Sequence, residues 1–286
     1  MSTKKELLNL CNTLGIIEPK LHAKKKEYIK QAIKNLHVSK GVKNITGTVV
    51  KEVKYIYHTA DIHIRCLARH QEYKQVFENL YTTLTKMGSQ HLNESVLVIC
   101  GDIFHNRDRL VSETIILFNN FIDKLTSVID VIVILGNHDT FTHTDRLDTI
   151  TGIFNLKTTP NFYFFKESSV YRYFNILFYV SSLYDNKFIR CPKKDIDHTV
   201  KHIALYHGPV YGCKLDNGLP YFSKESIKLS DFKDFDYALL GDIHKRQHLS
   251  NTIAYPGSLI QQNHSEDSIR GILRWDLHAI QAHLYK

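Results

Sequence analysis

Five short polar strings contain the residue types that bind divalent metal ions. They are DIH, GDIFH, GNHD, YHG and GDIH, and together they span residues 61–244. They supply carboxylates, an amide and imidazoles, and none of them contains a thiol. Such oxygen and nitrogen donors suit Mn²⁺, with Fe²⁺, Zn²⁺ or Mg²⁺ as alternatives that donor softness alone does not exclude. The strings predict a metal centre assembled from distant parts of the chain.

An apolar run typical of a buried strand precedes each polar string. The runs are YIYHTA, SVLVIC, VIVIL, HIAL and YALL. Open α/β sheets build their sites at the carboxyl ends of strands, so these runs would bring the polar strings to one edge. A single Asp or His after a strand is commonplace, whereas five such clusters are hard to attribute to packing.

Helix-like and strand-like segments alternate from residue 53 onward. Residues 70–87 and 112–126 have the apolar spacing of amphipathic helices, while residues 160–180 are rich in aromatic and β-branched side chains that favour sheet. Three later stretches predict closing strands: 252–258, 271–277 and 279–285. This order predicts an α/β sandwich.

Length and composition fit one large domain with a small appendage. The chain has 286 residues, of which 43% are hydrophobic. No apolar run reaches the roughly 18 residues of a membrane span, and the polar N-terminus lacks the apolar core of a secretory signal. We therefore expect an intracellular protein (cytoplasm or nucleus) with no membrane partner, whose five scattered cysteines are reduced thiols.

The net charge of +8 lies entirely in the N-terminal segment. Residues 1–54 contain twelve Lys and four Glu, and the remainder holds 25 basic and 25 acidic residues. Lysines that displace counterions give sequence-independent affinity for nucleic acid, so this segment predicts DNA binding. A solvated, solubilising arm is the alternative.

The apolar positions within this segment predict two short helices joined near Pro19. The string KKELLNLCNTLGI and the later KKKEYIKQAI resemble the SAP motif, a helical hairpin that binds DNA. We therefore divide the chain into a basic helical hairpin (1–36), a linker or lead-in to the first strand (37–52) and a catalytic domain (53–286).

The five polar strings, in order, resemble the calcineurin-like metallophosphoesterases. TADIH, GDIFH, GNHD, YHG and LLGDIHKRQ followed by IAYPGSLIQQN are similar to the DNA double-strand-break nuclease branch, the SbcD-like proteins. This resemblance implies a four-layer α/β/β/α sandwich with two divalent ions. Such ions, about 3.5–4 Å apart, neutralise a phosphodiester and generate hydroxide from bound water.

The resemblance also implies a role for each polar residue. Asp61, His63 and His244 would bind one ion, Asn137 and His207 the other, and Asp102 would bridge them. His138, oriented by Asp139, would act as general acid, a task suited to imidazole near neutral pH. His105 would lie near the same phosphate. Arg107 or Arg109 would add charge there, unless both belong to a solvated loop.

Asp242 departs from the cellular members of this branch, in which the fifth motif is Gly-His-x-His. A carboxylate can replace imidazole as an oxygen ligand, so we place Asp242 on the second metal; the alternative is an aspartate that orients a ligand. Positions 242 and 244 lie two residues apart on an extended strand end and would point the same way.

Three functions fit these observations. The first is a manganese-dependent DNA nuclease, the second is a phosphoesterase acting on RNA, nucleotides or small phosphodiesters, and the third is a binding protein that has lost activity. Retention of ligand-type residues at the inferred positions disfavours the third. Relatives of the branch use an SbcC-like ATPase partner and form homodimers, but only 42 residues follow His244, too few for the usual capping and partner-binding segments.

Overall fold

The computed structural model describes the chain in eight ranges: 42–45, 52–88, 91–107, 109–141, 148–153, 159–192, 197–279 and 281–285. The chain divides into two compact units, residues 1–42 and 43–286. The SAP-like hairpin predicted for residues 1–36 lies outside the described residues. The fold below is that of the second unit.

One sheet has six strands in the order β13-β12-β2-β3-β4-β5. The strands are β2 Tyr55–Thr59, β3 Ser95–Cys100, β4 Asp130–Ile134, β5 Phe162–Phe164, β12 Ile272–Asp276 and β13 Gln281–Tyr285. Strands β2 to β5 are parallel, and β12 and β13 join antiparallel. Every residue of β3 and β4 is buried, which explains their unbroken apolar sequences.

The other sheet has seven strands in the order β1-β6-β7-β8-β9-β11-β10. They are β1 Val42–Ile45, β6 Ser169–Tyr173, β7 Ile176–Ser181, β8 Lys201–His207, β9 Tyr237–Gly241, β10 Gln247–Ser250 and β11 Ile253–Tyr255. Strands β7, β8, β9 and β11 are parallel. Strand β1 lies within the range predicted to be a linker, so part of that segment belongs to the sheet.

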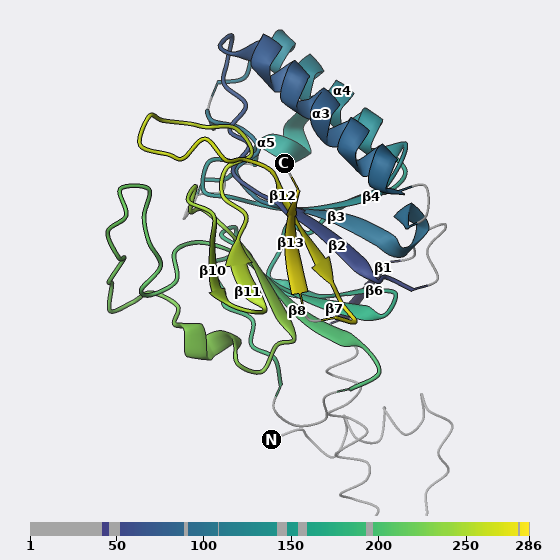
Figure 1. The fold of residues 1–286 in the computed structure, drawn as a ribbon, viewed down its shortest axis with the longest axis vertical. Helices are drawn as coiled ribbons and strands as arrows, with labels where there is room; N and C mark the ends of the chain where they lie inside the picture. Colours follow the sequence, from purple (N-terminus) through teal and green to yellow (C-terminus); the bar gives the residue numbers. More distant parts are fainter. Residues whose placement is uncertain are drawn as a thin grey trace, which may run out of the picture. The chain divides into compact units, whose positions relative to one another are not determined.

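The two sheets enclose a common apolar layer. Val98 and Ile134 of the six-stranded sheet belong to one buried cluster with Phe178 and Leu205 of the seven-stranded sheet. On the outer face of the six-stranded sheet lie α3 (His70–Gly88), α4 (Ser112–Thr126) and α5 (Thr149–Ile153) (Figure 1). Helices α3 and α4 have nearly the bounds that apolar spacing predicted.

The outer face of the seven-stranded sheet is covered differently from the prediction of a four-layer sandwich. In the described part of the chain its cover is the 3₁₀ helix η2 (Leu229–Phe232) and irregular segments, not an α-helix. The segment after β8 contains Gly208, Gly212, Gly218 and Pro220, which interrupt helical hydrogen bonding. A second 3₁₀ helix, η1 (Leu92–Glu94), leads into β3.

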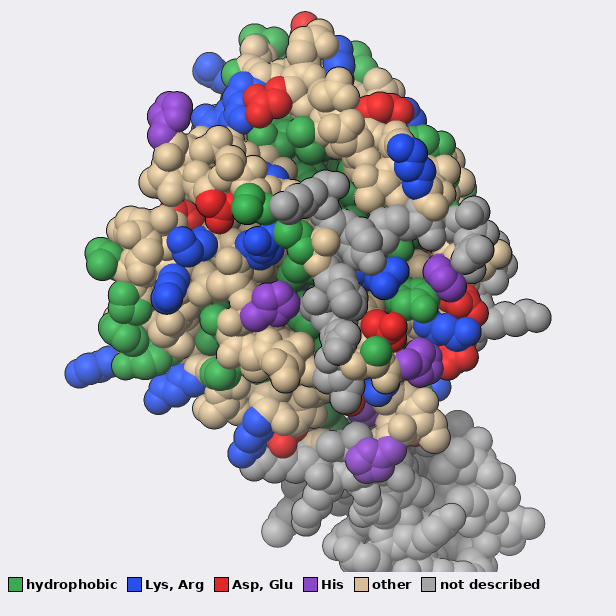
Figure 2. Space-filling view, in the orientation of Figure 1, with side chains coloured by type: hydrophobic (Ala, Val, Ile, Leu, Met, Phe, Trp, Pro, Cys, Tyr) green, Lys and Arg blue, Asp and Glu red, His purple; other side chains and the backbone are tan. Residues whose placement is uncertain are grey.

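The surface of this unit mixes charges of both signs. Figure 2 shows basic and acidic side chains interspersed over the visible face, as expected from the balanced charge of residues 55–286. Among the described residues no helix is long and apolar enough to cross a membrane. The four described cysteines are free thiols, in agreement with the expectation of reduced cysteines.

Candidate metal centre

All five polar strings lie at carboxyl ends of parallel strands, as predicted. Strands β2, β3 and β4 lead to the first three strings, and β8 and β9 lead to the last two. Backbone hydrogen bonds join neighbouring loops: Asp61 N donates to Gly101 O at 3.0 Å, and Gly208 N donates to Gly241 O at 3.1 Å. Asp242 N donates to Asp61 Oδ1 at 3.0 Å, which connects the two sheets. One site is therefore built from both sheets.

Four of the predicted metal ligands have left-handed backbone conformations. The φ angles of Asp61, His63, Asp102 and Asp242 are 53°, 52°, 55° and 93°. Residues other than glycine adopt this region at a cost of about 1–3 kcal/mol each, and such strain concentrates at functional sites. The strained backbone turns each side chain away from its strand and into the shared centre.

Two glycines are required by close approaches between these loops. A Cβ on Gly241 would lie 2.0 Å from the carbonyl oxygen of Cys100, and a Cβ on Gly136 would lie 2.1 Å from Asp102 Oδ1. Neither backbone can move without displacing a predicted ligand. The glycines that open the GNHD and GDIH strings therefore permit the strands to bring their polar residues together.

The first group of donors consists of Asp61, His63 and His244, whose ligand atoms lie within 4.8 Å of one another. The Nε2 atoms of His63 and His244 are 2.9 Å apart. Nδ1 of His244 donates to Glu266 Oε1 at 2.8 Å, so in the neutral ring the Nε2 lone pair points at His63. Two imidazole nitrogens so close together beside a buried carboxylate can serve as ligands of one cation.

Asp102 lies between this group and a second one. Its Oδ2 is 3.4 Å from Nε2 of His63, and its Oδ1 is 3.4 Å from Nε2 of His207. The two carboxylate oxygens therefore face two different histidines. Asp102 is almost completely buried, which excludes solvent as the main partner of either oxygen.

The second group surrounds His207. Nδ1 of this ring donates to the carbonyl oxygen of Cys100 at 2.7 Å, which directs Nε2 toward Oδ1 of Asn137 at 3.0 Å. Oδ1 of Asp242 lies 3.8 Å from the same Nε2. An amide oxygen, a carboxylate and an imidazole thus converge, so the altered fifth motif still brings a donor to this group.

Burial and mutual charge shift the pKa values of these carboxyl groups in opposite directions. Burial raises the pKa of Asp61 to about 7, and it also raises the pKa of Asp242. At Asp102 burial acts in the same direction, but the charges of His207 and His63 outweigh it and lower the pKa. Three carboxyl groups in one centre, of which Asp61 and Asp102 are buried and Asp242 is half-buried, require positive charge to remain ionised together.

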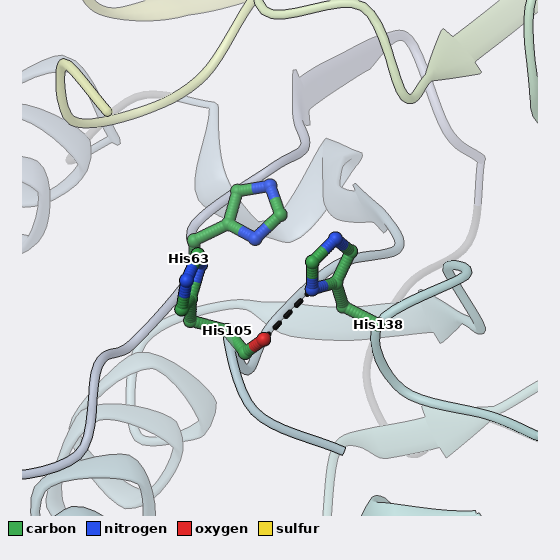
Figure 3. A group of neighbouring side chains, drawn as sticks. All are labelled: His63, His105 and His138. Atoms are coloured by element: carbon green, nitrogen blue, oxygen red, sulfur yellow. Dashed lines mark hydrogen bonds between the residues drawn. The ribbon is translucent and has the colours of Figure 1, made fainter. Parts of the chain in front are cut away.

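His63, His105 and His138 form a group of three imidazoles whose ring nitrogens lie within 4.8 Å of one another (Figure 3). Nδ1 of His138 donates to the backbone carbonyl oxygen of His105 at 2.7 Å. The His138 ring meets that of His63 edge to face, with centroids 4.7 Å apart. Both predicted catalytic histidines therefore lie beside the first donor group.

Asp139 does not hydrogen-bond to the His138 ring as the sequence predicted. Its buried carboxylate accepts hydrogen bonds from the backbone N–H groups of Ile103, Phe104 and Gly136, at 3.0–3.2 Å. The carbonyl of His105 takes the position expected for Asp139. Asp139 instead fastens the loop of Asp102 to the loop of Asn137 and His138.

Two acidic residues at the centre were missed by the sequence analysis. Glu266 is buried and accepts from His244; it also accepts from Ser258 Oγ at 2.9 Å and pairs with Arg270 at 2.8 Å. Asp216 Oδ2 lies 3.6 Å from Nδ1 of His244. Both residues lie in irregular segments, and the YPGSLIQQN string just before Glu266 is the only nearby signal.

The predicted arginines do not enter the centre. Arg107 and Arg109 are exposed, so their proposed contact with substrate stays a prediction. Arg65 was not singled out, yet its Nη2 donates to the carbonyl oxygen of Gln262 at 3.3 Å, and its charge contributes to lowering the pKa of His105 after burial. Arg65 is therefore a cation held near the histidine group.

Residues 54–246 match the calcineurin-like phosphoesterase family, and the chain belongs to this family. It is 40% identical over 238 residues to the uncharacterized protein R555 of Acanthamoeba polyphaga mimivirus, with 79% of this chain and 17% of that protein covered. It is 27% identical over 181 residues to 244L of Invertebrate iridescent virus 6, a proposed phosphoesterase, with 62% of each covered. The SbcD protein of the nuclease SbcCD from Staphylococcus epidermidis is 28% identical over 243 residues, with 74% of this chain and 62% of that protein covered.

Family membership and the buried donor groups define a metallophosphoesterase, a metal-dependent hydrolase of phosphate esters. The similarity to SbcD is distant, and the chain spans less than two thirds of the length of each of these relatives. The donor chemistry fits divalent ions, because carboxylate, amide and imidazole groups converge without a thiolate.

Proposed function

We propose that the chain is a two-metal nuclease that hydrolyses phosphodiester bonds in DNA. Asp61, His63 and His244 would hold one divalent ion, and Asn137, His207 and Asp242 the other. The observation that carries the two-metal arrangement is the position of Asp102, whose two oxygens lie 3.4 Å from His63 and from His207. Mn²⁺ is the proposed metal, because carboxylate and amide carbonyl oxygens, which make up most of the donor set, are ligands that suit it.

The residues around the ions would position the phosphate and supply the proton. When bound, two divalent ions neutralise the phosphate and lower the pKa of a coordinated water. His138 has its Nδ1 hydrogen fixed on the His105 carbonyl, so in the imidazolium form the second proton is on Nε2, which would donate it to the leaving oxygen. His105, next to Arg65, lies where it can contact a phosphate oxygen.

Two further observations support DNA as the substrate. One is the similarity to a bacterial protein named as part of a nuclease, which agrees with the SbcD-like strings of the sequence. The other is the location of the whole net charge of +8 in residues 1–54, joined to a charge-balanced catalytic unit. A basic segment of this kind would bind the polyanion while the metal centre cleaves it.

The test is a substrate panel with the purified full chain and Mn²⁺. Single-stranded DNA, duplex DNA, RNA and bis(para-nitrophenyl) phosphate are offered at equal phosphate concentration. We expect DNA to be cleaved with the highest kcat/KM. If the small diester or RNA is hydrolysed while DNA is left intact, the DNA assignment is wrong.

Asp102→Asn is the control variant for that panel. It preserves the size of the side chain and removes the charge shared by the two groups, so hydrolysis of every substrate should stop. Metal content should fall at the same time. Normal loading with two ions in this variant would contradict the bridging role.

A further inference from the structure

A cavity beside the metal centre has no role in the function proposed above. It has a volume of about 340 Å³ and lies at the carboxyl ends of β7 and β8. One wall is the turn after β7, and the other comes from the loop of residues 209–227. The loop is held by backbone hydrogen bonds from Tyr211 N to Ile227 O at 2.8 Å and from Gly212 N to Tyr221 O at 2.7 Å.

Two features place this cavity near the proposed metal ligands. Tyr206 lines it and directly precedes His207 in β8. A Cβ on Gly208 would lie 2.4 Å from the Tyr206 hydroxyl, so this side chain extends toward the carboxyl end of β8, the edge at which the polar strings lie. The loop of residues 209–227 also carries Asp216, 3.6 Å from His244 Nδ1.

The cavity walls combine aromatic rings with neutral polar groups. Phe188, Tyr206 and Tyr221 supply rings, and those of Phe188 and Tyr206 lie at 78° with centroids 5.9 Å apart. Hydroxyl and amide groups come from serines and an asparagine of both walls. The walls also contain one lysine and one glutamate, so their net charge is zero. The cavity therefore does not attract a second phosphate group.

We propose that this cavity binds the nucleobase next to the phosphate under attack, on the β8 side of the metal centre. This inference rests on the proposed nuclease function and adds a requirement to it. The volume is in the range of small-ligand sites, and a flat ring with hydrogen-bonding edges matches aromatic and amide walls. A base inside a duplex cannot enter without leaving its stack, so the substrate strand must be unpaired at this nucleotide.

The test uses single-stranded DNA carrying one abasic nucleotide at successive positions. With the wild-type protein, loss of the base on one particular side of a linkage should raise KM for that linkage about tenfold, the usual range for one stacked base. Loss of the base on the other side should have a smaller effect. In Tyr221→Ala and in Ser223→Trp, which fills the cavity, this difference should disappear.

Phe222→Ala is the matched control. It removes the neighbouring aromatic ring from the same loop, but Phe222 is 64% exposed and does not line the cavity. The base dependence should persist in this variant. If it persists equally in Tyr221→Ala and Ser223→Trp, the cavity is not the base site.

A binding measurement separates this inference from the nuclease proposal. Metal-depleted protein is titrated with deoxyadenosine monophosphate and, for comparison, with deoxyribose phosphate. Tighter binding of the nucleotide that is lost in Ser223→Trp supports the cavity even if no polynucleotide is cleaved. Cleavage of DNA without any base dependence, together with equal binding of both probes, overturns the inference while leaving the nuclease intact.

Discussion

The proton on His138 is the residue-scale feature most directly tied to chemistry. Because Nδ1 is fixed by the His105 carbonyl, Nε2 is the atom available to a leaving oxygen. His138→Ala should lower kcat for DNA by about 10²–10⁴-fold and keep its metal. The loss should be much smaller for bis(para-nitrophenyl) phosphate, whose leaving group needs no proton.

The measurement pairs kcat for both substrates with metal analysis. Equal losses on the two substrates would argue against proton donation, and loss of metal would show that His138 is a ligand. His105→Ala serves as comparison, since its ring stacks near that of His138 but is not expected to protonate the leaving oxygen.

Whether Asp242 is a metal ligand can be tested by removing its carboxylate and then by supplying an imidazole in its place. Asp242→Ala should reduce bound metal from two ions toward one, because Nε2 of His207 would lose a neighbouring ligand oxygen. Asp242→His should recover the second ion and much of the rate, since imidazole is an alternative ligand. Two fully occupied ions in the alanine variant would show that Asp242 only orients other groups.

Glu266 should act on metal affinity through the ring of His244. Its carboxylate fixes His244 Nδ1 and is itself held by Arg270 and Ser258. Glu266→Ala should weaken metal binding about 10–100-fold, as is usual for partners of ligand histidines, and Glu266→Gln should have a smaller effect.

Competition with a chelator measures this affinity. Glu113→Gln, an exposed position in the first turn of α4, is the control and should leave it unchanged. Unaltered affinity in Glu266→Ala would limit the residue to a structural role.

At the scale of elements, β2 contains a buried histidine that links stability to pH. Trp275 Nε1 donates to Nδ1 of His58 at 3.4 Å, and burial lowers the pKa of His58 from 6.5 to about 3. Below pH 6.5 the unfolded chain therefore binds a proton that the folded chain excludes. The free energy of unfolding should fall by up to about 1.4 kcal/mol per pH unit between pH 6 and 3 from this group.

Replacement by leucine should remove that contribution. Urea titrations of metal-depleted wild type and His58→Leu at several pH values give the difference directly. Parallel pH dependence in the two proteins would show that His58 is protonated without unfolding.

The sequence predicted those elements whose periodicity is regular and those residues that directly follow them. Helices α3 and α4 have a strong period because one face of each packs on the six-stranded sheet. The strands leading to Asp61, Asp102 and Asn137 have unbroken apolar runs because they are buried on both faces. The helical cover implied for the seven-stranded sheet does not appear among the described residues, since residues 209–227 form an irregular loop without a helical or strand period. Glu266 was missed because it lies in an irregular loop, where no helical or strand pattern marks it. Its role becomes visible only from its hydrogen bond to His244.

At the scale of the whole molecule, the basic N-terminal segment and the charge-balanced body should contribute separately. Deleting residues 1–36 removes eight lysines. DNA affinity at low salt should fall by more than tenfold and its salt dependence should flatten, because fewer counterions are released. Hydrolysis of bis(para-nitrophenyl) phosphate should change little.

Replacing Lys24, Lys25 and Lys26 by glutamine is a milder version that keeps the segment. Binding measured over a range of salt concentrations should give an intermediate slope for this variant. An unchanged slope in the deletion would show that residues 1–36 do not hold DNA, and loss of diester hydrolysis would place them in the catalytic fold.

The hydrogen bond between Asp242 N and Asp61 joins residues 181 positions apart in the chain. A ribosome synthesises Asp61, Asp102 and Asn137 long before it reaches β9, and until then the nascent chain lacks Asp242, His244 and the closing loop. Such an unfinished chain cannot complete either ion site as proposed. Synthesis order alone therefore keeps the hydrolase inactive until residues beyond His244 have been made.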